Sequence, residues 1–385
     1  MLQKLKLQIP WPLILLLFSL ATFLVYLATS GGTTPYDYFT RLGAAFLQGK
    51  YYLTSNPPWL NELIPIGVGK FAVVYPPSPA ILSIPFIIAF GQNFQQQILA
   101  HIMGALGAFV WGLIAYQRSG KKIVSLWVFL LVAFGNIVWF LAATGSVWYL
   151  GQVSAFLFLS LTIYESLNKR RWGLVALYFG LAILSRLQVV MALPIILYLN
   201  KNYIKILAGL TVFGIAFAFY NYLRFGNVFE TGYGLIPGVL DEPWYQKGIF
   251  DLSYIGSNLK AMFLSVPIIK NTFPYITPSW GGLSIFITSP VFIYSLFASS
   301  KSRENMLTWL SVFLITLVVL IHGGTGFTQF GYRYAVDFYP LLLLLIINAI
   351  DSKKLSWHHW LLLLVSILVN LWGVVFINKF GWVGF

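Results

Sequence analysis

The chain contains no cysteine among its 385 residues, so disulfide bonds, thiol nucleophiles and cysteine-ligated metals are excluded. Histidine is scarce as well: only His101 and His322, of four, fall near the predicted outer side, so no metal site is expected. The chain has no glycine-rich phosphate loop and no dense basic run with interleaved aromatics. These absences argue against a soluble nucleotide-sugar donor and a nucleic-acid partner. They leave a requirement for a divalent metal open, and no other cofactor is indicated.

Charge is the next scarce quantity. Only 9% of the residues are charged and 59% are hydrophobic, whereas a soluble protein has about a quarter of its residues charged. No hydrophilic stretch is long enough to form a soluble domain. Lipid must therefore solvate most of the surface. We predict an all-α polytopic membrane protein, with residues 1–385 forming one integral domain.

The net charge of +14 is concentrated in short loops at the ends of apolar runs. Together with Lys4 and Lys6, these loops hold 14 of the 24 lysines and arginines. They are residues 118–122, 169–171, 201–205, 301–303 and 353–354. Short basic loops remain cytoplasmic. The run at 10–28 is long enough to be an uncleaved anchor, so the N-terminus is placed in the cytoplasm. Short loops and the absence of cysteine suit a bacterial plasma membrane.

This orientation resolves two ambiguous runs. Residues 76–90 carry four prolines and are interpreted as an interfacial or re-entrant segment on the outer side. Residues 172–199 are interpreted as a hairpin turning at Ser185-Arg186, which keeps both basic flanks inside. The prediction is about eleven membrane helices, with residues 29–93 and 223–281 exposed outside. The helices are 10–28, 94–117, 123–143, 151–167, 172–185, 187–199, 203–222, 282–298, 307–322, 333–350 and 356–377.

Acidic residues number only ten, so each can be assigned a side. Glu304 and Asp351 fall in cytoplasmic loops, and Glu165 has the i,i+4 spacing of an ion pair with Lys169. The other seven lie on the outer side or at its edge. They are Asp37, Glu62, Glu230, Asp241, Glu242, Asp251 and Asp337. Any acid–base chemistry is therefore expected at the outer face.

Asp37 falls in a predicted amphipathic juxtamembrane helix at 36–48. Its apolar stripe is Tyr38, Phe39, Leu42, Ala45 and Phe46. Such a helix would lie flat on the outer leaflet and hold Asp37 at the level of lipid phosphates. A structural role is the alternative: Thr34 and Asp37 have the spacing of a capping box, and Asp37 can pair with Arg41 at i,i+4.

Three further ionisable residues fall in or near predicted helices. Arg333 lies one turn from Asp337, so they form either a mutual ion pair or a site for a phosphate or sugar. Arg186 lies between two helices too short to cross the bilayer, which places its guanidinium below the outer surface in a wet pocket. There it would bind a phosphate or a buried acid.

The order of these elements resembles the GT-C glycosyltransferases, in the bacterial branch similar to dolichyl-phosphate-mannose mannosyltransferases. The resemblance rests on segments 36–49 (YDYFTRLGAAFLQG), 75–80 (YPPSPA), 184–186 (LSR), 221–233 (NYLRFGNVFETGY), 288–290 (TSP) and 331–337 (GYRYAVD). It implies a polyprenyl-phosphate sugar as donor and a role for Asp37 beside the acceptor. Many members carry a second acid next to the first, whereas this chain has Tyr38 there and its next acid at Glu62.

The resulting hypothesis is sugar transfer at the outer face to a lipid, polysaccharide or protein acceptor. Asp37 would deprotonate or orient the acceptor. Arg186 and Arg333, with Lys70, would bind the phosphate. The remaining expected binding residues are Arg41, Glu230 and Asp337. The alternatives are a lipid or glycolipid transporter or flippase without covalent chemistry, and an inactive scaffold; transporters favour internal repeats and acids near the midplane, and neither is evident.

Overall fold

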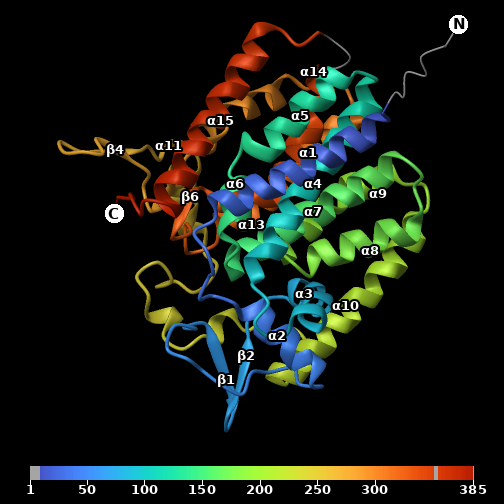
Figure 1. Cartoon of the computed structure of the whole chain (residues 1–385). Helices are drawn as coiled ribbons and strands as arrows, with labels where there is room; N and C mark the ends of the chain where they lie inside the picture. The colour runs from blue at the N-terminus through green and yellow to red at the C-terminus, as the bar shows by residue number, and fades with distance from the viewer. Residues whose placement is uncertain (1–8, 351–353, 385) are drawn as a thin grey trace, which may run out of the picture.

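The computed structural model describes residues 9–350 and 354–384. It is built of helices with three two-stranded sheets (Figure 1). Lys4, Lys6, Asp351 and Lys353, which entered the sequence-based topology, lie outside the described residues. The all-α prediction is confirmed, and the protein is a multi-pass membrane protein.

Seven helices of the described ranges are long and apolar enough to cross a membrane. They are α1 (Trp11–Thr29), α4 (Gln96–Ser119), α7 (Val147–Leu167), α10 (Tyr203–Phe225), α13 (Arg303–Leu320), the 3-10 turn η6 (Arg333–Phe338) continued by α14 (Tyr339–Ile350), and α15 (Trp357–Asn378). An eighth span is possible if α5 (Lys122–Phe134) and α6 (Val138–Thr144), bent by 50° at their junction, count as one. The number of eleven helices is therefore not confirmed.

The predicted helices 172–185 and 187–199 form the expected short hairpin, and neither is long enough to cross a membrane alone. Helix α8 (Trp172–Ile183) leads through an extended Arg186 into η1 (Leu187–Ala192) and α9 (Leu193–Leu199).

The predicted helix 282–298 is wrong. It divides into strand β5 (Gly281–Leu283), one turn α12 (Ile285–Thr288) and the 3-10 segment η5 (Pro290–Phe297). Pro290 lacks the N–H that a continuous helix needs, and β5 pairs with β6 (Gln329–Gly331) in parallel.

Helices α4 and α7 form the centre of the bundle. Within their apolar windows 72% and 83% of residues are buried, against 11% for α10 at the periphery. Helix α4 packs on α1, α5 and α7, while α7 also packs on α8. The small residues Gly104 and Gly107 of α4 lie directly against Tyr26 and Phe156, which allows this close packing.

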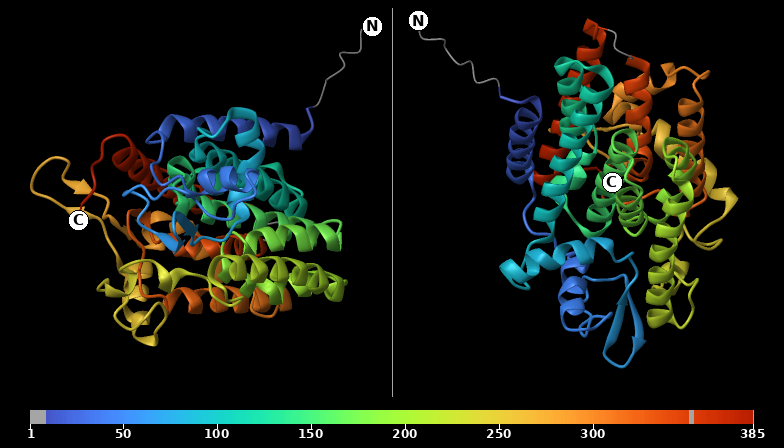
Figure 2. Two further views of the ribbon diagram at one scale, coloured as in Figure 1. Left: turned by 90° about the horizontal axis from the view of Figure 1, so that it is seen from below. Right: turned by 90° about the vertical axis from the view of Figure 1, so that its right-hand side faces the viewer.

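One end of the molecule is built from the segment between α1 and α4. Helix α2 (Tyr38–Leu47), helix α3 (Ser78–Phe90) and the antiparallel hairpin β1 (Leu63–Gly67) and β2 (Lys70–Val73) lie together there (Figures 1 and 2). The chain after α10 forms the turns η2 (Tyr233–Leu235), η3 (Val239–Asp241) and η4 (Leu252–Tyr254), then α11 (Ile255–Leu264) and the hairpin β3 (Ile268–Ile269) and β4 (Ile276–Thr277), with α11 and β4 drawn near α15 in Figure 1. The sequence assigns this end to the outer face.

The apolar stripe of α2 faces protein, which corrects the prediction that this helix lies flat on lipid. Tyr38, Phe39 and Leu42 are fully buried. Helix α2 packs on α3, and a Cβ added at Gly43 would lie 2.5 Å from Ser83 Oγ and 2.8 Å from the Ala80 carbonyl oxygen. The contact between the two helices therefore requires glycine at position 43.

We expect Gly43→Val to destabilise the protein by about 1–3 kcal/mol, the usual cost of overpacking a buried contact. The added methyls would force α2 away from α3. Thermal melting in detergent measures the effect. Gly214→Val is the matched control, because nothing lies within 4 Å of a Cβ at Gly214. Equal melting temperatures for the two variants would contradict the tight contact at Gly43.

Two local contacts differ from the sequence-based expectations. Glu165 pairs with Arg171 at 2.7 Å instead of Lys169, because the chain turns back after α7. Asp37 is itself the residue that precedes α2 and makes no side-chain capping bond. Thr34 Oγ1 instead accepts from the Tyr36 N–H. The capping box that the alternative interpretation of Asp37 allowed is therefore not formed.

Candidate functional site

Two cavities adjoin the segment that carries Asp37. Asp37 lines the first and Phe39, two residues later, lines the second. The rings of Tyr36 and Trp148 pack against each other with centroids 4.7 Å apart, and Trp148 belongs to the wall of the second cavity. The predicted site residues are thus distributed over two neighbouring compartments.

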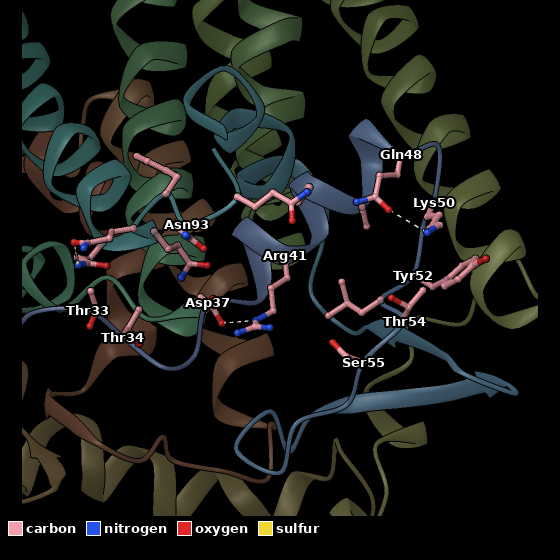
Figure 3. Close-up of a pocket in the computed structure, with 18 residues that line it drawn as sticks. Thr33, Thr34, Asp37, Arg41, Gln48, Lys50, Tyr52, Thr54, Ser55 and Asn93 are labelled. Carbon is pink, nitrogen blue, oxygen red and sulfur yellow. Dashed lines mark hydrogen bonds and ion pairs between the residues drawn. The ribbon is translucent and has the colours of Figure 1, made fainter. Parts of the chain in front are cut away.

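The polar cavity, as we call the first, has a volume of about 420 Å³. Its lining is dominated by hydroxyl, amide and charged side chains. These are Thr33, Thr34, Asp37, Arg41, Gln48, Lys50, Tyr52, Thr54, Ser55, Gln92, Asn93, Gln95, Gln96 and Gln97. In Figure 3, Asp37 and Arg41 point toward each other between Thr33 and Thr34 on one side and Thr54 and Ser55 on the other. Such a lining suits a ligand rich in hydroxyl groups.

Asp37 forms the ion pair with Arg41 that the sequence allowed, with Arg41 Nε 2.7 Å from Asp37 Oδ1. The side chains of Asp37 and Arg41 remain 28% and 35% exposed. The pair is therefore accessible from the polar cavity, where Arg41 orients the carboxylate and one carboxylate oxygen remains open to a ligand.

The arginine cavity, as we call the second, has a volume of about 430 Å³ and combines cations with apolar walls. Arg186 and Arg333 contribute the charge. Its apolar lining includes Phe39, Val74, Val147, Val190, Met191, Phe217, Ile249, Phe250, Val318 and Val319. The combination matches an amphiphile that has an anionic head and a hydrocarbon chain.

Arg186 is fixed by a carboxylate from a distant part of the chain. Arg186 Nη2 lies 3.2 Å from Asp337 Oδ2, and Gln188 Nε2 donates to the same oxygen at 2.6 Å. The Asp337 side chain is fully buried and lines neither cavity. Asp337 therefore positions Arg186, and its partner is Arg186 instead of the Arg333 that one interpretation of the sequence allowed. Its contact with substrate stays a prediction.

Of the two arginines that line this cavity, Arg333 is the one without a carboxylate of the described residues in salt-bridge contact. Its guanidinium lies over the ring of Tyr334 at 4.8 Å and near that of Tyr149 at 5.9 Å. Its backbone is fixed by Gln152, which donates to the carbonyl oxygen, and by Gln329, which accepts from the N–H. Arg333 Nε has no hydrogen-bond partner among the described residues, and the buried hydroxyl of Tyr75, in the same cavity wall, has none either. Both groups are therefore available to donate to acceptor oxygens in this cavity.

Glu62, the next acid after Asp37 in the outer segment 29–93, is a candidate site residue that the sequence-based prediction did not include. Its Oε2 accepts from the indole N–H of Trp148 at 3.0 Å, and its backbone N–H donates to the Tyr38 hydroxyl at 3.1 Å. Burial raises the pKa of Glu62 to about 7. The Trp148 hydrogen bond and the charge of Arg333 only partly oppose this rise. A carboxylate that titrates near neutral pH beside a cavity is characteristic of functional sites.

Lys70 and Glu230 are not brought to either cavity. Lys70 is exposed at the start of β2, with its Nζ 5.1 Å from the ring centre of Tyr52. Glu230 Oε1 accepts from the Gly232 N–H at 2.6 Å and so shapes a turn. The neighbours Thr231 and Tyr233 do line the arginine cavity.

The described residues contain no group of three or more histidine or acidic side chains able to hold a metal ion.

Comparison with known proteins identifies the fold. No family model and no curated protein sequence matches the chain. Among solved structures, ArnT from Cupriavidus metallidurans bound to undecaprenyl phosphate is similar, with a TM-score of 0.56 and 12% identity over 93% of this chain. The Archaeoglobus fulgidus oligosaccharyltransferase, tethered with an acceptor peptide, is similar over 96% of this chain with a TM-score of 0.51 and 12% identity. This chain spans 63% and 55% of the lengths of those two proteins. The protein therefore has the GT-C fold, as the sequence resemblance implied.

Proposed function

We propose that the protein is a membrane glycosyltransferase that moves a hexosyl or pentosyl group from a polyprenyl phosphate to a cell-envelope acceptor. The arginine cavity supports this proposal, because two guanidinium groups, both near the ring of Tyr334, share its lining with apolar side chains. The GT-C fold adds support, since one similar structure is described as bound to undecaprenyl phosphate. The reaction takes place at the outer face of the plasma membrane, with the N-terminus in the cytoplasm.

The donor would bind with its phosphate between Arg333 and Arg186 and its isoprenoid along the apolar wall. Arg333 has an unpaired Nε for a phosphate oxygen, while Arg186 is already oriented by Asp337. A guanidinium donates in a fixed fork that matches phosphate oxygens. Arginine also stabilises the charge that develops on the leaving phosphate. The unpaired Tyr75 hydroxyl supplies a further donor.

The acceptor would occupy the polar cavity, with its reacting hydroxyl or amine at Asp37. The bond between the anomeric carbon and the phosphate oxygen breaks, and a bond from that carbon to the acceptor forms. Asp37 takes the acceptor proton or orients the acceptor, and polyprenyl phosphate leaves with the bonding electron pair. Arg41 holds the Asp37 carboxylate for this role. Trp148, which lines the donor cavity, packs on Tyr36, the residue before Asp37.

The test is release of polyprenyl phosphate by the purified protein. The wild type, in lipid nanodiscs, is incubated with polyprenyl-phosphate sugars and with lipid, polysaccharide and peptide acceptors. We expect release that requires both one donor and one acceptor class. Binding of a donor without release by any acceptor would instead favour a transporter or flippase, whose cavity also needs a phosphate site. Absence of donor binding would overturn the assignment of the arginine cavity.

A further inference from the structure

Glu62 contacts a wall residue of the arginine cavity and the residue that follows Asp37. Its carboxylate accepts from the Trp148 indole, whose ring lines the arginine cavity and packs on Tyr36, the residue before Asp37. Its backbone N–H donates to the hydroxyl of Tyr38, the residue after Asp37. The position of Glu62 is thus tied on one side to the donor compartment and on the other to the segment that holds Asp37.

The charges around Glu62 make it sensitive to an anion in the arginine cavity. Arg333 is the cation that interacts with it, and Glu242 is the other anion. Trp148 of α7 and Tyr38 of α2 form hydrogen bonds with Glu62. The groups that interact with it through charge are Arg333 of η6, Glu242 after η3, and Tyr233 and Tyr245 of the chain after α10. A phosphate bound by Arg333 would add negative charge within this group. Like charges raise a carboxyl pKa, so the phosphate favours protonated Glu62.

We propose that Glu62 is a positioning residue that orients Trp148 and offsets the charge of Arg333, and that it takes up a proton when phosphate binds beside Arg333. This inference rests on the proposed donor site. The donor phosphodiester carries one negative charge, and loss of the sugar leaves a phosphate monoester with nearly two at neutral pH. A proton taken from solvent by Glu62, which is partly exposed, offsets the added charge. Because the pKa of Glu62 is already about 7 when no phosphate is bound, a small added negative potential from a phosphate suffices to protonate it.

The measurement is binding of farnesyl methyl phosphodiester, a probe whose single charge does not change between pH 6 and 9. Calorimetry is run across this range in two buffers of different ionisation enthalpy. For the wild type we expect the affinity to fall about threefold to tenfold as pH rises, because ionised Glu62 repels the probe. Near pH 7.5 binding should take up a fraction of one proton. In Glu62→Gln both the pH dependence and the proton uptake should vanish.

Three comparisons separate this role from a merely structural one. Glu62→Gln should melt like the wild type at pH 6, where the wild-type residue is mostly protonated. Trp148→Phe removes a hydrogen bond that lowers the Glu62 pKa, so the fall in affinity should move to higher pH. Asp241→Asn, an exposed acid in the loop after α10, should keep the wild-type profile.

The outcomes distinguish this inference from the proposed function. Binding of the probe with no pH dependence, or with the same dependence in Glu62→Gln, would overturn the role of Glu62 and leave the donor site intact. Failure of the probe to bind at any pH would overturn the donor site and, with it, this inference.

Discussion

Asp37→Asn should reduce the rate of sugar transfer by about 10²–10⁴, the range over which general-base assistance usually contributes. Asparagine keeps the size of the side chain but neither accepts a proton nor carries the charge that orients an acceptor hydroxyl. Asp37 is accessible in the polar cavity, so the substitution should leave folding largely intact. The effect is measured as kcat for polyprenyl phosphate release, with donor and acceptor both saturating.

Arg41→Gln distinguishes catalysis from a structural ion pair. If Asp37 serves only to pair with Arg41 at 2.7 Å, the two variants should lose the same stability and the same activity. A partly exposed i,i+4 pair contributes only about 0.3–0.5 kcal/mol, so stability should change little in either. We expect Asp37→Asn to lose far more activity than Arg41→Gln. Asp251→Asn, at a half-buried acid in the chain after α10 that accepts from the Ser253 N–H, controls for general loss of negative charge.

Arg333→Gln should weaken use of the donor by about 2–4 kcal/mol, which corresponds to about a 30-fold to 1000-fold fall in kcat/KM for the lipid-phosphate sugar. The unpaired Nε and the absence of a salt-bridging carboxylate among the described residues make Arg333 the main available cation in the cavity. Arg186 gives a less clear test, because its removal leaves the fully buried Asp337 without an ion partner. Arg333 is therefore the residue to change first.

Two comparison variants show whether the effect is local. Lys247→Gln removes an exposed positive charge from the chain after α10 and should leave kcat/KM unchanged. Arg333→Lys keeps the charge but loses the planar fork, so its activity should fall between wild type and Arg333→Gln. An undiminished kcat/KM in Arg333→Gln, with the protein folded, would show that the phosphate binds elsewhere.

Local patterns in the sequence were sufficient for the class of protein and several of its elements. The scarcity of charge and the long apolar runs require a membrane environment, and the apolar spacing in 36–48 predicts α2. The shortness of the two runs around Ser185-Arg186 predicts a hairpin that turns inside the molecule, and Arg186 does line a cavity there. Predictions were weakest where a proline interrupts an apolar run, as at Pro290, because hydropathy does not register a missing backbone donor.

By itself the sequence determined that the chain is a helical membrane protein, because the scarcity of charge and the spacing of apolar residues are local properties of the chain. Only the tertiary structure decided which charges meet. Asp337 pairs with Arg186, 151 residues away, and not with the Arg333 one turn before it. Glu62 meets Trp148 across 86 residues. Such contacts depend on how helices and turns pack against one another, and that packing alone divides the site residues between a polar and an arginine-lined cavity.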